Sequence, residues 1–481
     1  MKHYLLIIVF LAVCSTYLHG QDNILIYSKQ VSDSKEIINK ILQKSGTYTS
    51  VDFVGFNLDK IQENEKFLLH LGEKIIPIRK DRIDVRGSNN FVFTGSNNNG
   101  FSILFSVLDN DIQGVIETGE EVLTIETVGE QQYALINVDH SMLREACDNL
   151  QEYSRSIVDI EDNNQYSSTG SDDGIKSSAA LETVTAYDCK IRVLVLYTPN
   201  AQSSVSNIKN TVMTAVALAN QSFANSQINY QIELVYAGQT NYTESGFGID
   251  LSRFEGAGDG YMDEVHTLRN KYSADVCVLL ISDNEYCGLA SGIGTTAANA
   301  FCVVSTYSTC ATSNYSFAHE IGHLMGCRHD PFVDNTTTPF AYGHGYVNSS
   351  KGWRTIMAYR DACDSCRRLQ YWSNPNITYG GDPMGTASTN NNARVWNERS
   401  NIVMTFRQPN NNVTFTSSDI PNTQYADVIA KQNITTSGVV NVNNGNTLKM
   451  WAGNNIILQP GFSVQTGAEY SAEIENIDDC F

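Results

Sequence analysis

Residues 319–330 read HEIGHLMGCRHD, and this stretch carries the clearest chemical pattern in the chain. His319 and His323 are four residues apart, so on a helix their imidazoles project from the same face. Gly326 is placed to end that helix in a left-handed conformation, so that the chain turns and His329 returns as a third ligand. Three neutral imidazoles with one open position are typical of catalytic zinc, because structural zinc has a fourth protein ligand.

Glu320 directly follows the first histidine, and a helix would direct its carboxylate beside the metal and not at it. From there Glu320 can take a proton from zinc-bound water and later give it to a leaving amine. The alternative is that these are ordinary helix and turn residues. Gly326 and His329 in register make that alternative a minor one.

The extended motif resembles HExxHxxGxxH of the metzincin zinc endopeptidases, which is followed by a Met-turn. The turn here would be TIMAY, with Met357 placed 28 residues after His329, and the resemblance implies that Met357 forms an apolar floor under the imidazoles. Asp330, AYGHGYV and GWRTIMAY are similar to the reprolysin (adamalysin) branch. The segments IRVLVLYTPNA, FAHEIGHLMG and WSNP resemble the bacterial peptidyl-Asp metallopeptidase group. The resemblance covers about 190–407 and implies an α/β domain with a twisted sheet and an active-site helix.

Reprolysins generally lack a tyrosine two residues after the Met, whereas astacin-like and serralysin-like members have one. Tyr359 would either steady the oxyanion, as there, or pack beside the turn. If the peptidyl-Asp resemblance extends to specificity, a cation selects acidic side chains, and Arg360, Arg367 or Arg368 could supply it; solvated surface arginines are the alternative. A peptide substrate is expected to lie antiparallel to an edge strand, for which residues 300–307 are the candidate.

Strands alternate with helices in the pattern around the motif. Residues 191–196 are a nearly continuous apolar run, as expected for a strand buried on both faces. Thr198 and Pro199 then begin a long helix whose apolar stripe extends to Phe223. Further strands are predicted at 228–236, 276–281 and 301–304, and a short helix at 261–271.

The N-terminal third predicts export and processing. Residues 1–20 have the pattern of a secretory signal peptide, with lipidation at Cys14 as the minor alternative. Residues 21–153 show short strands and turns, for example 102–107, 114–117, 122–126 and 133–138, and predict a mostly β propeptide. Residues 154–188 are acidic and rich in Ser and Gly, which predicts an exposed linker with a processing site.

Ten cysteines remain after the signal peptide, and an exported protein is expected to pair most of them. Eight lie at 189–366, where they can pair among themselves. Family resemblance favours Cys287 with Cys310. Cys363 and Cys366 lack the second CxxC of a zinc ribbon, so a disulfide near the active site is the preferred interpretation.

Cys147 is then the single thiol of the propeptide. A thiolate is a good zinc ligand, so Cys147 could occupy the open position and keep the precursor latent, as in related metalloproteases. The alternatives are that Cys147 pairs with Cys480 or lies buried as a small apolar residue.

Residues 413–481 turn to Asn-rich alternation and predict a separate, small all-β module. The module resembles those at the ends of exported Bacteroidetes proteins, which suggests surface attachment, secretion or adhesion.

The composition agrees with a multidomain globular protein of 481 residues. With 42% apolar and 17% charged residues, the chain is neither disordered nor a multi-span membrane protein. Its net charge of -20 excludes the basic surface that nucleic acids require. The sequence therefore predicts a secreted zinc endopeptidase made as a zymogen, acting on proteins or peptides and inhibited by its own propeptide. A non-catalytic surface adhesin that retains the zinc site is the alternative, and Ca²⁺ as a second cofactor has no clear motif behind it.

Overall fold

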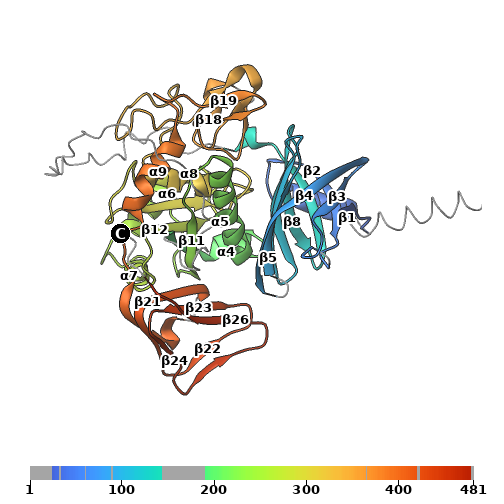
Figure 1. Ribbon diagram of the computed structural model, residues 1–481. Coiled ribbons are helices and arrows are strands. Elements are labelled where there is room, and N and C mark those ends of the chain that lie inside the picture. The colour runs from blue at the N-terminus through green and yellow to red at the C-terminus, as the bar shows by residue number, and fades with distance from the viewer. Residues whose placement is uncertain are drawn as a thin grey trace, which may run out of the picture.

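The computed structural model describes residues 24–31, 34–59, 61–87, 90–143, 190–363, 366–419 and 423–477. A β-barrel, an α/β unit and a coiled β-layer follow one another along the chain (Figure 1). The predicted signal peptide, the predicted linker and Cys147 lie outside the described residues.

Nine strands of the N-terminal part close into a barrel in the order β1-β2-β9-β8-β7-β6-β5-β4-β3. The elements are β1 (Ile24–Ser28), α2 (Ser34–Leu42), β2 (Tyr48–Phe56), β3 (Lys66–Leu71), β4 (Lys74–Gly87), β5 (Asn90–Ser96), β6 (Ser102–Leu108), β7 (Asp111–Glu117), β8 (Val122–Gly129), β9 (Gln132–Val138) and η1 (His140–Met142). The four strands named from the sequence are confirmed as parts of β6 to β9. Phe93, Ile103 and Phe105 fill the barrel, while the alternating Val92 and Leu104 point out of it into the core of the α/β unit.

The α/β unit contains a parallel sheet that carries helices on both faces. Its first elements are β10 (Ile191–Tyr197), α4 (Pro199–Ser204), α5 (Ile208–Asn225), β11 (Ile232–Gln239), α6 (Phe247–Glu255), α7 (Glu264–Lys271), β12 (Val276–Ile281), β13 (Gly288–Ala290), β14 (Phe301–Ser305) and α8 (Ser316–Met325). The strand order is β13-β14-β12-β10-β11, and only β13 is antiparallel within this set. Along β10, Val193 and Val195 join the core beneath α5 and α8, whereas Leu194 and Leu196 join the core beneath α6.

Two local predictions need correction, and one helix was missed. The long helix is broken at Asn207, whose side chain accepts the backbone N–H of Asn210 and so starts α5 separately from α4. Helix α6 was not predicted. Residues 300–307 do not form an edge strand, because β14 lies between β12 and β13, and β13 ends this side of the described sheet.

Short elements follow α8 and surround the motif-bearing helix. They are β15 (Val347–Asn348), η2 (Ser349–Lys351), β16 (Trp353–Arg354), η3 (Arg360–Ala362), β17 (Arg367–Arg368), β18 (Asn374–Tyr379), β19 (Asp382–Met384) and α9 (Asn392–Val403). Trp372 and Trp396 are both buried beside Phe223 of α5, so α9 and the segment before β18 are tied to the same core as α8.

The C-terminal strands continue the central sheet of the α/β unit. They are β20 (Asn410–Thr416), η4 (Ser417–Asp419), β21 (Thr423–Ser437), β22 (Val440–Val442), β23 (Thr447–Ala452), β24 (Asn455–Ile457), β25 (Phe462–Val464) and β26 (Glu469–Ile474). β21 pairs antiparallel with β11 and so extends the central sheet. Tyr425, Thr447 and Glu469 pair in parallel register at 22-residue intervals, which makes this layer a coil. Asn433 bonds to Asn412 at 2.8 Å and accepts from Asn455 at 3.1 Å along the same coil.

The cysteine predictions hold in part. The disulfides Cys287–Cys310 and Cys363–Cys366 are confirmed. Extensive pairing is wrong for Cys277, Cys302 and Cys327, which are free and buried. Cys302 lies opposite Val278 and Cys277 opposite Phe301, so the register of β12 and β14 keeps the two thiols from facing each other. None of the described helices has the length and apolarity that crossing a membrane requires.

Candidate metal centre

Helix α8 positions the first two histidines, and it packs on β13, β14 and α5. It ends at Gly326, whose φ of 108° and ψ of 9° confirm the left-handed turn expected there. A Cβ at Gly326 would stand 2.8 Å from the ring of Phe340, so both the dihedral angles and the packing favour glycine. The chain then turns back and brings His329 over the helix.

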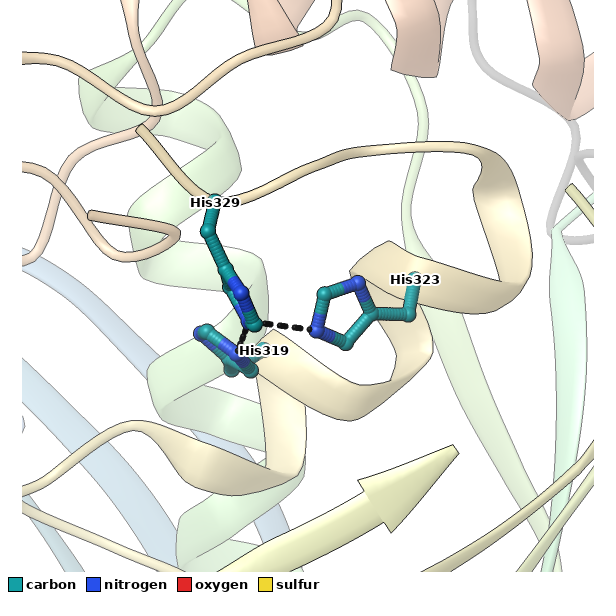
Figure 2. A group of neighbouring side chains, drawn as sticks. All are labelled: His319, His323 and His329. Atoms are coloured by element: carbon teal, nitrogen blue, oxygen red, sulfur yellow. Dashed lines mark hydrogen bonds between the residues drawn. The ribbon is translucent and has the colours of Figure 1, made fainter. Parts of the chain in front are cut away.

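Figure 2 shows the rings of His319, His323 and His329 converging on one point. The Nε2 atom of His329 lies 3.3 Å from that of His319 and 3.0 Å from that of His323. Two nitrogen ligands of a tetrahedral zinc ion, each at about 2.0–2.1 Å, are about 3.3–3.4 Å apart. The spacing of the triad therefore fits a zinc ion.

Backbone carbonyls determine which nitrogens of the triad face inward. The Nδ1–H of His319 donates to the Ile356 carbonyl at 3.0 Å, and that of His323 donates to the Cys327 carbonyl at 2.9 Å. Because a carbonyl oxygen only accepts, Nδ1 carries the proton and the inward Nε2 presents its lone pair. Burial lowers the pKa of all three histidines, that of His323 to about 4, which favours the neutral form that binds metal.

The side chain of Glu320 lies against β13. A Cβ built on Gly288 would stand 2.4 Å from its Oε1 atom. The side chain is buried, and neither carboxylate oxygen has a hydrogen-bond partner among the described residues. Burial raises the pKa of Glu320 to about 8, and the charge of Arg368 opposes that rise. A cation bound at the triad would further favour the carboxylate form.

Met357 packs against Gly322 of α8, and its role as an apolar floor under the imidazoles stays a prediction. A Cβ on Gly322 would stand 3.0 Å from the Met357 Sδ atom and 2.7 Å from the ring of Trp372. Gly322 therefore gives the sulfur and the indole room to pack against the backbone between the first two histidines. The Met357 side chain is fully buried.

Tyr359 and Asp330 connect the third histidine to the Met-turn. The ring of Tyr359 lies 4.0 Å from that of His329, centre to centre, and 6.1 Å from that of His319. Asp330 accepts the backbone N–H of Tyr359 at 2.8 Å. The structure thus places Tyr359 beside the ligands.

The comparisons with known proteins agree with this geometry. The sequence profile of the reprolysin group of Metallo-peptidase family M12 matches residues 187–373. A peptidyl-Asp metalloendopeptidase of Stenotrophomonas maltophilia K279a is 43% identical over 320 residues, which are 65% of this chain and 72% of that protein. The chain belongs to the reprolysin-like M12 metallopeptidases.

Two further relatives carry the same name. The protein of Stenotrophomonas maltophilia R551-3 is 41% identical over 68% of this chain and 74% of its own length. That of Xanthomonas campestris is 54% identical over 44% of this chain and 51% of its own length. Among solved structures, metalloproteinase-II from Bacteroides fragilis aligns with a TM-score of 0.33 and 12% identity over 61% of this chain and 85% of that chain, a similarity too low to assign the fold.

Family membership makes the chain a zinc metalloendopeptidase and favours the enzyme over the adhesin that the sequence left open. The residues that would hold the zinc ion are His319, His323 and His329. They form the only cluster of three or more His, Cys, Asp or Glu ligand atoms within the described ranges, so no second such cluster supports a Ca²⁺ ion there.

Sequence reasoning had not assigned His344, which lies within AYGHGYV. Its buried ring bonds through Nδ1 to the main-chain carbonyl of His329 at 2.8 Å. His344 therefore holds the segment that returns the third ligand of this metallopeptidase. The sequence did carry a signal for this role, namely a histidine between two glycines shortly after the motif.

The three candidate arginines differ in position. The charge of Arg368, which is buried in β17, acts on His319, Glu320 and His329. Its Nη1 donates to the carbonyl of Asn314 at 3.0 Å, just before α8. Arg367 instead donates to the Tyr379 hydroxyl at 2.7 Å, and Arg360 begins η3. Of the three arginines, Arg368 is therefore the one whose charge acts on the residues of the metal site.

Proposed function

We propose that this metallopeptidase is a secreted endopeptidase, made as a zymogen, in which Glu320 activates the attacking water. The carboxylate of Glu320 carries the proposal, since it is buried next to the triad without a hydrogen-bond partner among the described residues. Leaving a buried carboxylate unpaired is costly. A water at the open metal position is the partner that such a carboxylate would serve.

The reaction follows from the residues in place. Held by His319, His323 and His329, a zinc ion would lower the pKa of a bound water to about 7 and would polarise the scissile carbonyl. Glu320 accepts the proton that water loses as its oxygen bonds to the carbonyl carbon. When the C–N bond breaks, the same carboxyl group gives that proton to the leaving amine and becomes a carboxylate again. Tyr359 is the candidate for steadying the oxyanion, with packing against His329 as its competing role.

Strand β13 supports recognition of an extended peptide. Its one sheet neighbour among the described strands is β14, and Gly288 brings it directly against Glu320. A substrate that added antiparallel to β13 would use main-chain hydrogen bonds for affinity and place its scissile bond beside Glu320. This explains why peptides are the substrate class.

Aspartate is the side chain that we expect the enzyme to select. The relatives at 41–54% identity are named peptidyl-Asp metalloendopeptidases. Arg368 supports the same preference in this chain, because a buried guanidinium pairs strongly with a carboxylate.

Export and latency complete the proposal. The signal-like residues 1–20 support secretion, with lipid anchoring at Cys14 as the minor alternative and attachment through the C-terminal strands as a further one. The acidic linker at 154–188 supports processing, and Cys147 is the candidate latency ligand.

Glu320→Gln tests the mechanism. The variant should keep one zinc ion per chain by metal analysis, while kcat/KM for a peptide falls by about 10²- to 10⁴-fold because the base is lost. Glu285→Gln removes an exposed carboxylate from the loop before β13 and should behave as wild type. Substantial activity in Glu320→Gln, or loss of its zinc, would overturn the assigned role.

A further inference from the structure

Helix α5 is buried on both of its faces. Val212, Ala215 and Phe223 face the core of the α/β unit. The polar side chains of Asn210 and Thr211 are buried as well, because α5 packs against β6 and β7 of the barrel. A helix at a protein surface keeps its polar face in water. The sequence of α5 therefore suits a position between two layers.

The barrel contributes apolar side chains to this covered face. Five residues of its outer surface are buried in the same hydrophobic cluster as α5 and the central sheet: Val92, Leu104, Leu108, Val115 and Val122. Removing the barrel would expose a contiguous apolar surface on the catalytic domain. Such a surface is typical of a stable interface and not of a transient one.

The polar groups of the interface are matched in pairs. Asn210 donates to Asp111 Oδ1 at 2.6 Å, and Ser206 donates to Asp111 Oδ2 at 2.8 Å. Thr211 donates to Gln113 at 2.9 Å. Each bond joins the α5 region to β7, and separation would leave its partners to find new ones.

Glu117, the last residue of β7, reaches the start of the metal-binding helix. Its carboxylate accepts a hydrogen bond from the Tyr315 hydroxyl, and both side chains are buried. Burial raises the pKa of Glu117, whereas the Tyr315 hydroxyl, the charge of Arg367 and a backbone bond from Gln370 favour the carboxylate. The carbonyl of Tyr315 accepts the N–H of His319 at 3.0 Å, so this contact lies one turn from the first zinc ligand.

We propose that the N-terminal barrel stays bound to the catalytic domain as a lasting partner after the chain between residues 143 and 190 is cut, with Glu117 as its anchor at Tyr315. The barrel is then a structural subunit of the enzyme. The proposal concerns binding alone, so it can fail or succeed independently of the proposed mechanism.

The test cuts the chain without removing anything from it. The recognition sequence of a site-specific protease replaces residues 164–171 in the Glu320→Gln chain, which prevents self-cleavage. After complete cleavage, size-exclusion chromatography with light scattering at about 1 μM should show one particle containing both fragments, since stable interfaces of this kind have Kd values well below that. A barrel fragment that elutes alone would overturn the proposal.

Variants on both sides of the interface test the anchor. Glu117→Ala should raise the Kd of the cut complex by about 10- to 100-fold, measured by dilution of a labelled barrel fragment. Glu120→Ala is the matched control, because it removes an exposed carboxylate from the turn after β7. Tyr315→Phe should weaken binding similarly, and the double variant should cost less than the product of the two effects, because both remove one bond. The anchor would be disproved if Glu117→Ala and Glu120→Ala bound with equal Kd. It would also be disproved if the effects of Glu117→Ala and Tyr315→Phe on Kd multiplied fully in the double variant.

Discussion

The backbone of Gly288 touches the carboxylate of Glu320. A Cβ atom at position 288 would stand 2.4 Å from Oε1 and 2.5 Å from Cγ of the glutamate. The side chain of the proposed base thus occupies the position that a Cβ atom of residue 288 in the edge strand would need. Only glycine at this position leaves room for the Glu320 side chain.

Gly288→Ala should therefore displace the base without unfolding the protein. The atoms in its way belong to the flexible end of Glu320, so the side chain moves before the backbone does. A displacement of about 1 Å can cost about 10²-fold in rate, which steady-state kinetics would record as a lower kcat with zinc retained. Gly292→Ala is the control, since its nearest neighbour would be 3.7 Å away. Wild-type kcat in Gly288→Ala would contradict the positioning.

His323→Ala should lose the metal. Loss of a hydrogen-bond partner of a zinc ligand typically lowers zinc affinity by roughly 10- to 100-fold. Loss of a ligand itself should lower the zinc affinity by more than that. Metal analysis after dialysis against a chelator measures the loss. His70→Ala, which alters β3 of the barrel, should retain full occupancy. Full zinc in His323→Ala would mean that the ligand assignment is wrong.

Arg368→Gln should reduce the preference for aspartate. Paired peptides that differ only by Asp or Asn would show the ratio of their kcat/KM values fall by about 10- to 100-fold, because a charge-assisted hydrogen bond is lost. Arg367→Gln, whose guanidinium bonds Tyr379 in the parent, should leave the ratio unchanged. An unaltered ratio in Arg368→Gln would return the choice to Arg360 or Arg367.

Cys147→Ser should make the uncut precursor active, and a thiol-reactive mercurial should activate the wild-type precursor. Leu143, four residues earlier, packs against Cys287 and Cys310, and Cys287 precedes Gly288. Cys480→Ser is the control for a disulfide between the two ends. Unchanged latency in Cys147→Ser would leave steric blockage by the propeptide as the explanation.

The metal centre could be predicted because its information is local. His319, His323, Gly326 and His329 lie within eleven residues, and helical geometry with one left-handed glycine brings them together. The backbone carbonyls that orient the rings come from Ile356 and Cys327. A carbonyl has no sequence signature, so these partners were not predictable.

Long-range pairing explains the predictions that failed. Which strand ends a sheet depends on contacts between distant segments, and β13 has only three residues, too few to show a pattern. Val92 and Phe93 are both apolar, so their sequence did not reveal that one faces the barrel interior and the other the catalytic domain. The coil had a signal in Gly445 and Gly467, 22 residues apart with positive φ, but its repeats share too few other residues to stand out.

The antiparallel pairing of β11 with β21 affects where this chain can be shortened. A fragment that stopped at the end of α9 would keep every zinc ligand but would leave the β11 edge bare. Unprotected edges recruit strands from other molecules and lead to aggregation. Solubility, and not turnover, would then be the first property to suffer in a trimmed enzyme.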